Sequence, residues 1–243
     1  MILPRIEQRA QEGLLADPNA WLDKLLQVRN AAGKNNIIVV LGEPRVGKSA
    51  VAVVLARRND KTFTVDRILW DPEDYFKIYK TLPSPCYIIF DEGGVSHDTE
   101  SWGRAVQRAA RHSTQAFGFK LINIIIVATE LRFIDITHRT MGQYVLVVQD
   151  RGQALVRRKW SDHIGHMYLL PVGRLRDYPM VDKEFWDEYS KRKEVAYDEM
   201  MVKETQKIER ANKRDAKRLL KEGFDIKEPV IKNEGLERRE LLA

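Results

Sequence analysis

The chain has 243 residues, 44% hydrophobic and 31% charged, with a formal net charge of +6, enough to bury one sizeable α/β core with appendages. A single cysteine excludes a disulfide framework and a thiolate zinc cluster, and favours a reducing cytoplasm. No apolar stretch approaches the ~20 residues of a membrane-spanning helix, and the first residues lack a signal peptide's apolar core, so we expect a soluble protein without a membrane partner.

Residues 5–32 have the pattern of helical structure. Trp21, Leu22 and Leu25 recur at helical spacing and would give an apolar face, and Asp17-Pro18-Asn19 is a plausible helix start. We expect this N-terminal helical segment, residues 1–34, to pack on the core beside the loop that follows.

The next segment is a strand, a loop and a helix. Residues 35–41 are β-branched and apolar, as in a buried strand, and residues 50–58 predict a helix. Between them, Gly42-Glu43-Pro44-Arg45-Val46-Gly47-Lys48-Ser49 fits the phosphate-binding loop at every fixed position. Its glycines let backbone N–H groups face phosphates, and the helix N-terminus adds positive potential. The alternative is a glycine-rich turn that binds nothing.

This phosphate loop predicts a site for ATP and Mg²⁺. Lys48 would reach the β and γ phosphates, Ser49 would offer its hydroxyl to Mg²⁺, and Ala50 would close the loop at the start of the helix. We predict a second strand over residues 62–70 and a connecting helix over 72–82.

A second carboxylate motif follows the apolar run 86–90, which predicts a central parallel strand ending at the site. Asp91 would hold the Mg²⁺ shell. Glu92 would polarise a water for attack on the γ-phosphate, which favours hydrolysis over transfer to a small molecule. The alternative is a solvated turn after a strand.

Residues 99–115 predict a helix, with Arg104, Arg108 and Arg111 on one face. These guanidinium groups would line a DNA channel or reach a neighbour's nucleotide, or they form an ordinary solvated face. Residues 121–128 are the most apolar stretch and predict a third strand that delivers Thr129 to the same edge. Thr129 is a candidate γ-phosphate sensor, or it caps the following helix.

The last third begins with a strand over 144–149 that turns into a hairpin with 154–160. A long helix is expected from 183 to 223, because the stretch lacks proline and interior glycine. Its basic face consists of Lys221 and five further basic side chains, stacked at spacings of three and four residues, a pattern that suits a phosphate backbone. The five are the candidate nucleic-acid contacts: Lys203, Lys207, Arg210, Arg214 and Lys217. The alternative is a solvated helix held by intrahelical ion pairs.

Over residues 35–160 the chain resembles the additional-strand P-loop ATPases, and within them the FtsK/HerA-like branch of DNA translocases, viral genome-packaging ATPases and zonular occludens toxin-like proteins. The phosphate loop, Asp91-Glu92, Thr129-Glu130 and the segment 133–139 carry the resemblance. Family members often have Gln where this chain has Glu130. The resemblance implies a sheet ordered 5-1-4-3-2, a ring homo-oligomer, commonly a hexamer, and an arginine supplied across the subunit boundary, for which Arg139 is the first candidate and Arg132 the second.

The sequence thus predicts an α/β protein, a P-loop NTPase three-layer sandwich with a mostly parallel sheet, an N-terminal helical segment and a long C-terminal helix. The expected divisions are 1–34, 35–180 and 181–243. The leading interpretation is a Mg²⁺-dependent ATPase that translocates or packages double-stranded DNA, encoded by a virus or mobile element. The alternative is a nucleotide-dependent assembly protein whose C-terminal helix binds virion or assembly proteins, and a small-molecule kinase is the weakest candidate.

Overall fold

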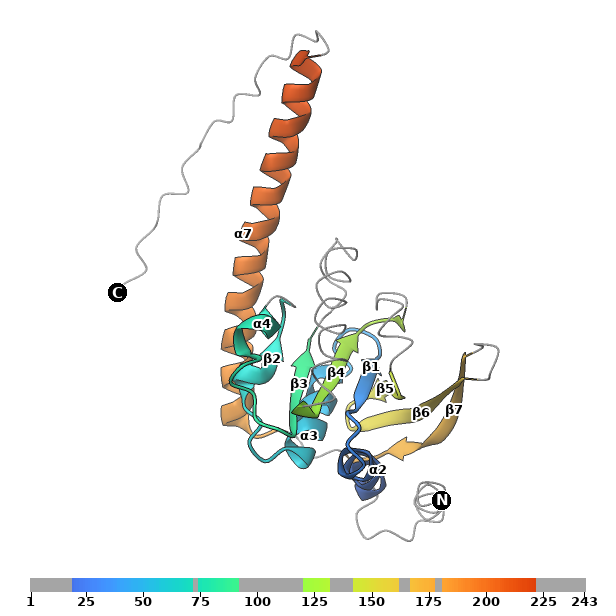
Figure 1. Ribbon diagram of the computed structural model, residues 1–243. Coiled ribbons are helices and arrows are strands. Elements are labelled where there is room, and N and C mark those ends of the chain that lie inside the picture. Colours follow the sequence, from blue (N-terminus) through green and yellow to red (C-terminus); the bar gives the residue numbers. More distant parts are fainter. Residues whose placement is uncertain are drawn as a thin grey trace. The chain divides into compact units, whose positions relative to one another are not determined.

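The computed structural model describes residues 19–71, 74–91, 120–131, 142–161, 167–177 and 181–221 (Figure 1). The described residues up to Tyr197 belong to one compact unit, and those from Asp198 belong to a second. None of the helices in these ranges is both long enough and apolar enough to cross a bilayer.

The first unit is built on a seven-stranded sheet in the order β2-β3-β4-β1-β5-β6-β7 (Figure 1). The first five strands in this order run parallel, and β6 and β7 are added antiparallel at one edge. The parallel part therefore has the order 5-1-4-3-2 that the resemblance implied. The strands are β1 (Ile37–Leu41), β2 (Ile68–Leu69), β3 (Cys86–Phe90), β4 (Ile122–Ala128), β5 (Tyr144–Asp150), β6 (Gln153–Ser161) and β7 (Met167–Leu175).

Both faces of the parallel strands are buried, which explains why their sequences are continuous apolar runs rather than alternating ones. In β1, Ile38 and Val40 face one core, and Ile37 and Val39 face the other. Helices α2 (Ala20–Ala31) and α3 (Lys48–Asn59) pack in the first core, and α4 (Asp74–Ile78) contributes to the second. The predicted α/β sandwich of three layers is confirmed.

Two predicted elements are shorter than the sequence pattern suggested. The strand predicted over 62–70 is a 3-10 turn, η1 (Val65–Arg67), followed by the two residues of β2. The Asp60 carboxylate accepts hydrogen bonds from the Thr62 N–H at 2.9 Å and the Arg67 guanidinium at 2.7 Å, and these bonds hold the chain in a turn. The helix predicted over 72–82 has five described residues, in α4.

Strand β7 was not predicted. It pairs with β6 from Ala154↔Leu175 to Ser161↔Met167 and extends the predicted hairpin by one strand. Helix α2 lies against it, since the Trp21 indole is 2.7 Å from the position that a Cβ on Gly173 would take. Just outside the two elements, the Asn19 side chain donates to the Arg176 carbonyl at 2.7 Å and accepts from the Arg176 N–H at 3.0 Å. The helices predicted over 99–115 and after Thr129 lie outside the described residues.

The predicted long C-terminal helix is α7 (Lys183–Lys221). Its first turns belong to the first unit, where Phe185 and Trp186 pack against the core and Tyr189 is buried within it. Ion pairs join Asp182 to Arg57 just before the helix and Arg192 to Asp66 within it. The residues of α7 from Asp198 onward belong to the second unit.

Candidate nucleotide site

The phosphate loop lies between the end of β1 and the start of α3, as the sequence predicted. Gly47 has a φ of 97° and directly precedes Lys48, the first residue of α3. Gly42 has a φ of 154°, and a Cβ there would lie 2.6 Å from the Val148 carbonyl oxygen of β5. Glycine is therefore required at Gly42 by the close approach of a neighbouring strand as well as by the backbone angle.

Lys48 is buried at the N-terminus of α3, and its ammonium donates to the Glu43 carbonyl oxygen at 2.7 Å. The side chain therefore bends back across the loop that it closes. An ammonium beside the first N–H groups of a helix creates the positive environment that phosphate oxygens require.

Ser49 and Asp91 meet although they are 42 positions apart, because their Oγ and Oδ1 atoms form a hydrogen bond of 2.9 Å. Ser49 is the second residue of α3, and Asp91 follows the last residue of β3, so both stand at the carboxyl edge of the sheet. Asp91 is 1% exposed. A hydroxyl and a carboxylate oxygen at this distance are hard oxygen donors of the kind that Mg²⁺ prefers. The pair therefore fits the predicted metal site.

Asp91 has further partners that the sequence did not reveal. Its Oδ2 atom accepts a hydrogen bond from the Tyr189 hydroxyl, and the Lys193 ammonium lies 3.6 Å from the same oxygen. Both residues come from α7, about a hundred positions along the chain. The aromatic and basic residues of this helix gave a signal for packing and for charge, but none for contact with Asp91.

Strand β5 and its turn lie against the phosphate loop. Val148 approaches Gly42, and the Arg151 side chain passes within 3.8 Å of the position that a Cβ on Gly47 would take. Arg151 therefore brings a guanidinium-bearing side chain next to the predicted phosphate site. It was not among the sequence-predicted site residues, because a charged residue in a hairpin turn is ordinarily explained by exposure alone.

Thr129 is exposed at the end of β4, as a sensor would be. The register pairs Leu41 with Ala128, so Gly42 and Thr129 leave their neighbouring strands at the same level. The parallel strands thus bring Thr129 to the edge that holds the phosphate loop, and its role stays a prediction.

Several predicted residues lie outside the described part of the chain. These are Glu92, the predicted base; Arg139 and Arg132, the candidate arginine fingers; and Arg104, Arg108 and Arg111. Their roles also stay predictions.

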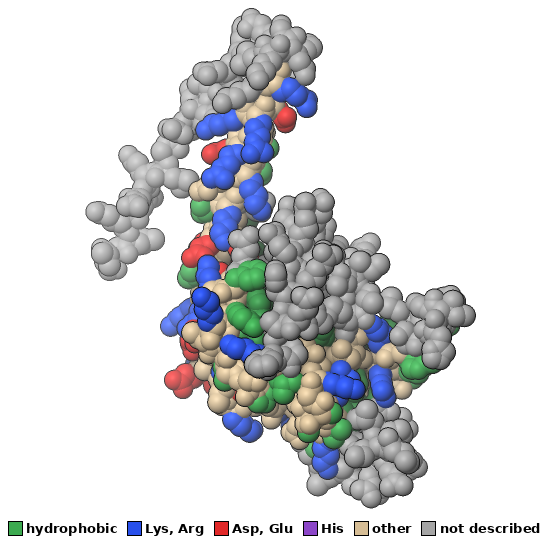
Figure 2. All heavy atoms as spheres, in the orientation of Figure 1, with side chains coloured by type: hydrophobic (Ala, Val, Ile, Leu, Met, Phe, Trp, Pro, Cys, Tyr) green, Lys and Arg blue, Asp and Glu red, His purple; other side chains and the backbone are tan. Residues whose placement is uncertain are grey.

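The predicted basic face is on α7, and Lys203, Lys207, Arg210 and Arg214 are exposed there. Lys217 is within the helix as well. Figure 2 shows Lys and Arg side chains gathered along this helix. No contact in the described residues tests whether this face binds nucleic acid.

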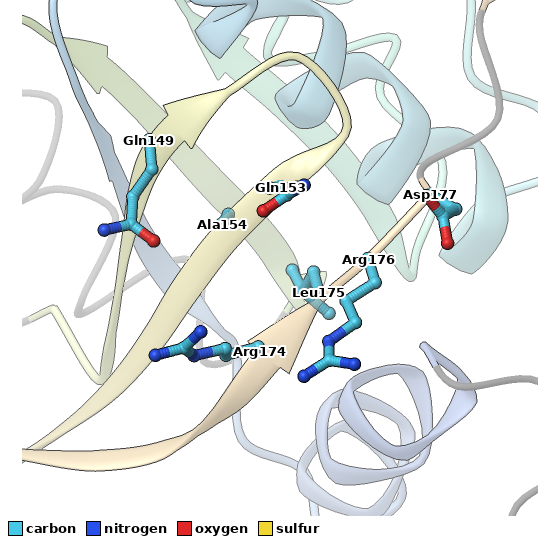
Figure 3. A pocket seen from close by; sticks show the side chains of 7 residues that line it. All are labelled: Gln149, Gln153, Ala154, Arg174, Leu175, Arg176 and Asp177. Atoms are coloured by element: carbon cyan, nitrogen blue, oxygen red, sulfur yellow. The ribbon is translucent and has the colours of Figure 1, made fainter.

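A cavity of about 220 Å³ lies where β5, β6 and β7 come together (Figure 3). It contains no residue of the phosphate loop and none of the predicted site residues. Its lining is polar and includes two arginines: Gln149, Gln153, Ala154, Arg174, Leu175, Arg176 and Asp177.

No protein-family model and no curated protein matches the chain. Among solved structures, it is similar to the N-terminal domain of a zonular occludens toxin from Neisseria meningitidis, with 15% identity, a TM-score of 0.35, and coverage of 63% of this chain and 97% of that one. It is also similar to ATPases 2 and 3 of EssC from Geobacillus thermodenitrificans, with 12% identity and a TM-score of 0.40. That match covers 67% of this chain and 44% of the EssC chain.

Proposed function

We propose that the chain binds a nucleoside triphosphate, with ATP as the expected one, together with Mg²⁺ and hydrolyses it. The observation that carries this proposal is the hydrogen bond of 2.9 Å between Ser49 Oγ and Asp91 Oδ1 beside the phosphate loop. A glycine-rich turn without a ligand gives no reason for a carboxylate that is 1% exposed to meet a hydroxyl at the first turn of the next helix.

Each residue of the site has one task in this proposal. The loop N–H groups and Lys48 bind the phosphates, and Ser49 and Asp91 hold the metal ion. Bound Mg²⁺ would neutralise negative charge on the phosphate oxygens. Glu92, next to Asp91 in sequence, would accept a proton from the attacking water, and Thr129 would donate to the γ-phosphate.

Two variants separate binding from hydrolysis. Lys48→Ala removes a charge from the phosphate site and should abolish nucleotide binding, whereas Glu92→Gln should bind normally and lose turnover, by about 10²-fold or more for a general base. Titration with a fluorescent nucleotide and phosphate release measure the two properties. Lys24→Ala, at an exposed lysine of α2, is the control and should change neither. Equal loss of binding in Glu92→Gln and Lys48→Ala would contradict the assigned role of Glu92.

We further propose that hydrolysis moves or packages double-stranded DNA, in a ring of identical subunits commonly numbering six. Residues 203–222 contain eight Lys or Arg and four Asp or Glu, so they carry +4 of the formal +6. Basic side chains on one helical face neutralise phosphates without reading sequence. The same proposal includes an origin in a virus or mobile element and Arg139 as an arginine donated between subunits, which both rest on the resemblance. It also includes a location in the cytoplasm, which rests on the single cysteine.

The DNA contact is tested by its salt dependence. Replacing Lys207, Arg210, Arg214 and Lys217 with Gln should reduce the slope of log affinity against log salt by up to about 3.6, if all four contact phosphates of a duplex. The control replaces four exposed lysines outside α7 with Gln, which changes the net charge equally: Lys24, Lys34, Lys61 and Lys80. An unchanged slope in the helix variant would favour the second candidate function, a nucleotide-dependent assembly protein whose C-terminal helix binds other proteins.

A further inference from the structure

The two oxygens of the Asp91 carboxylate face different elements. Oδ1 accepts from Ser49 of α3, at 2.9 Å, on the side of the phosphate loop. Oδ2 accepts from the Tyr189 hydroxyl of α7. The Asp91 N–H donates to the Leu69 carbonyl at 2.9 Å, which fixes the backbone at this position. Hydrogen bonds to both oxygens therefore orient the carboxylate. Only the bond from Ser49 comes from the phosphate loop, and the bond from Tyr189 comes from α7.

Tyr189 is itself held rigidly. It is 3% exposed, its ring stacks on Trp186 with centroids 4.6 Å apart, and it packs against Trp70 at 5.8 Å. A ring confined by two indoles has little freedom to turn its hydroxyl elsewhere. The hydrogen bond to Asp91 thus costs little additional side-chain entropy.

Lys193 continues the chain of hydrogen bonds. It lies four residues after Tyr189, on the same helical face, and its ammonium donates to the Tyr189 hydroxyl oxygen at 3.2 Å. The same ammonium is 3.6 Å from Asp91 Oδ2. It therefore places a positive charge beside a carboxylate that is proposed to hold a divalent cation.

We propose that Tyr189 is a positioning residue that keeps Asp91 in the orientation needed to bind Mg²⁺, and that Lys193 is a counterion that competes with the metal for the carboxylate. This inference rests on the proposed function. A hydrogen bond to a ligating carboxylate fixes its orientation, and the loss of such a bond typically costs 10–100-fold in metal affinity. The positive charge of Lys193 has the opposite effect, since it repels a second cation.

Helix α7 is thereby coupled to the metal site. Coupling between two sites is reciprocal, so metal binding weakens the contact between Lys193 and Asp91 by the same factor by which Lys193 weakens metal binding. The start of α7 would then respond to the nucleotide state through Lys193.

The test measures Mg²⁺-dependent nucleotide binding by fluorescence, without relying on turnover. Tyr189→Phe keeps the ring and its indole contacts, and should raise the half-saturating Mg²⁺ concentration about tenfold while leaving metal-free nucleotide binding unchanged. Lys193→Gln should lower that concentration, by roughly fivefold, and Lys193→Arg, which keeps the charge, should not. Tyr197→Phe is the matched control: the Tyr197 ring lies 5.6 Å from the Lys193 ammonium on the same helix. It should shift nothing.

Two results would overturn the inference. If Tyr189→Phe lowers the free energy of unfolding but leaves the Mg²⁺ requirement unchanged, Tyr189 only anchors α7. If Lys193→Gln raises the Mg²⁺ requirement, its ammonium supports the site and does not compete. Lys193 is half-buried, so its variants remain informative should Tyr189→Phe fail to fold. Absence of Mg²⁺-dependent nucleotide binding in the unaltered chain would instead refute the proposed function.

Discussion

Gly42 is the residue at which the phosphate loop comes closest to strand β5. An added Cβ would lie 2.6 Å from the Val148 carbonyl oxygen and 3.0 Å from a methyl group of Val46. The first contact is with backbone, which cannot turn away as a flexible side chain would. A substitution here must therefore displace either the loop or the strand.

Gly42→Ala should destabilise the protein by about 2–6 kcal/mol and sharply weaken nucleotide binding, because strain and the clash, each costing about 1–3 kcal/mol, add at one position. Urea unfolding and a nucleotide titration measure the two effects. Gly33→Ala is the control: Gly33 also has a positive φ, of 68°, but no atom lies within 4 Å of the added Cβ. It should cost only roughly 1–2 kcal/mol and leave binding unchanged. Equal loss of nucleotide binding in the two variants would contradict this account.

At the scale of elements, α2 and β7 are joined through Gly173 and Trp21. A Cβ on Gly173 would lie 2.7 Å from the Trp21 indole, which is 1% exposed. Because Gly173 has no side chain, helix α2 can approach strand β7 closely at this position. This packing holds the antiparallel edge of the sheet in the same unit as the nucleotide site.

Gly173→Ala should lower the free energy of unfolding by about 1–3 kcal/mol, since the indole must shift in a filled core. Combining it with Trp21→Phe, which removes the ring atoms nearest the new methyl group, should cost less than the sum of the two single changes. Chemical unfolding of all three variants gives the coupling energy. Strict additivity would show that the two residues do not interact.

At the scale of the whole molecule, alkaline pH should weaken the fold through groups buried in β3. Burial raises the pKa of the Cys86 thiol from 9.0 to about 12, and burial also raises the pKa of its neighbour Tyr87 above the ordinary value. The folded state keeps these protons, whereas the unfolded chain releases them. Stability is therefore fully present below pH ~9 and declines as the pH rises toward the folded pKa values.

The loss due to Cys86 should be about 1.4 kcal/mol between pH 8 and pH 10, because each unit of pH above the unfolded pKa contributes that amount. Urea unfolding at the two pH values measures it. Cys86→Ala should lose correspondingly less stability over the same interval, although its stability at pH 8 will be lower. An equal loss in the variant and the unaltered chain would mean that the thiol does not titrate in this range.

The sequence by itself determined the parts that depend on neighbouring residues. The apolar runs of β1, β3, β4 and β5, the glycines of the phosphate loop and the uninterrupted α7 are all local patterns, and the placement of Asp91 at a strand end followed from them. Parallel strands deliver their carboxyl ends to one edge, so the meeting of Ser49 and Asp91 was also predictable.

Only the tertiary structure decided the remaining features. The apolar run of strand β7 is interrupted by Pro171 and Gly173, two residues that disfavour a strand, so its pairing with β6 and its cover by Trp21 determine its conformation. The hydrogen bond from Tyr189 to Asp91 spans 98 positions. It depends on where α7 packs, and hydrophobic periodicity can indicate that a helical face is buried without indicating which residues it will contact.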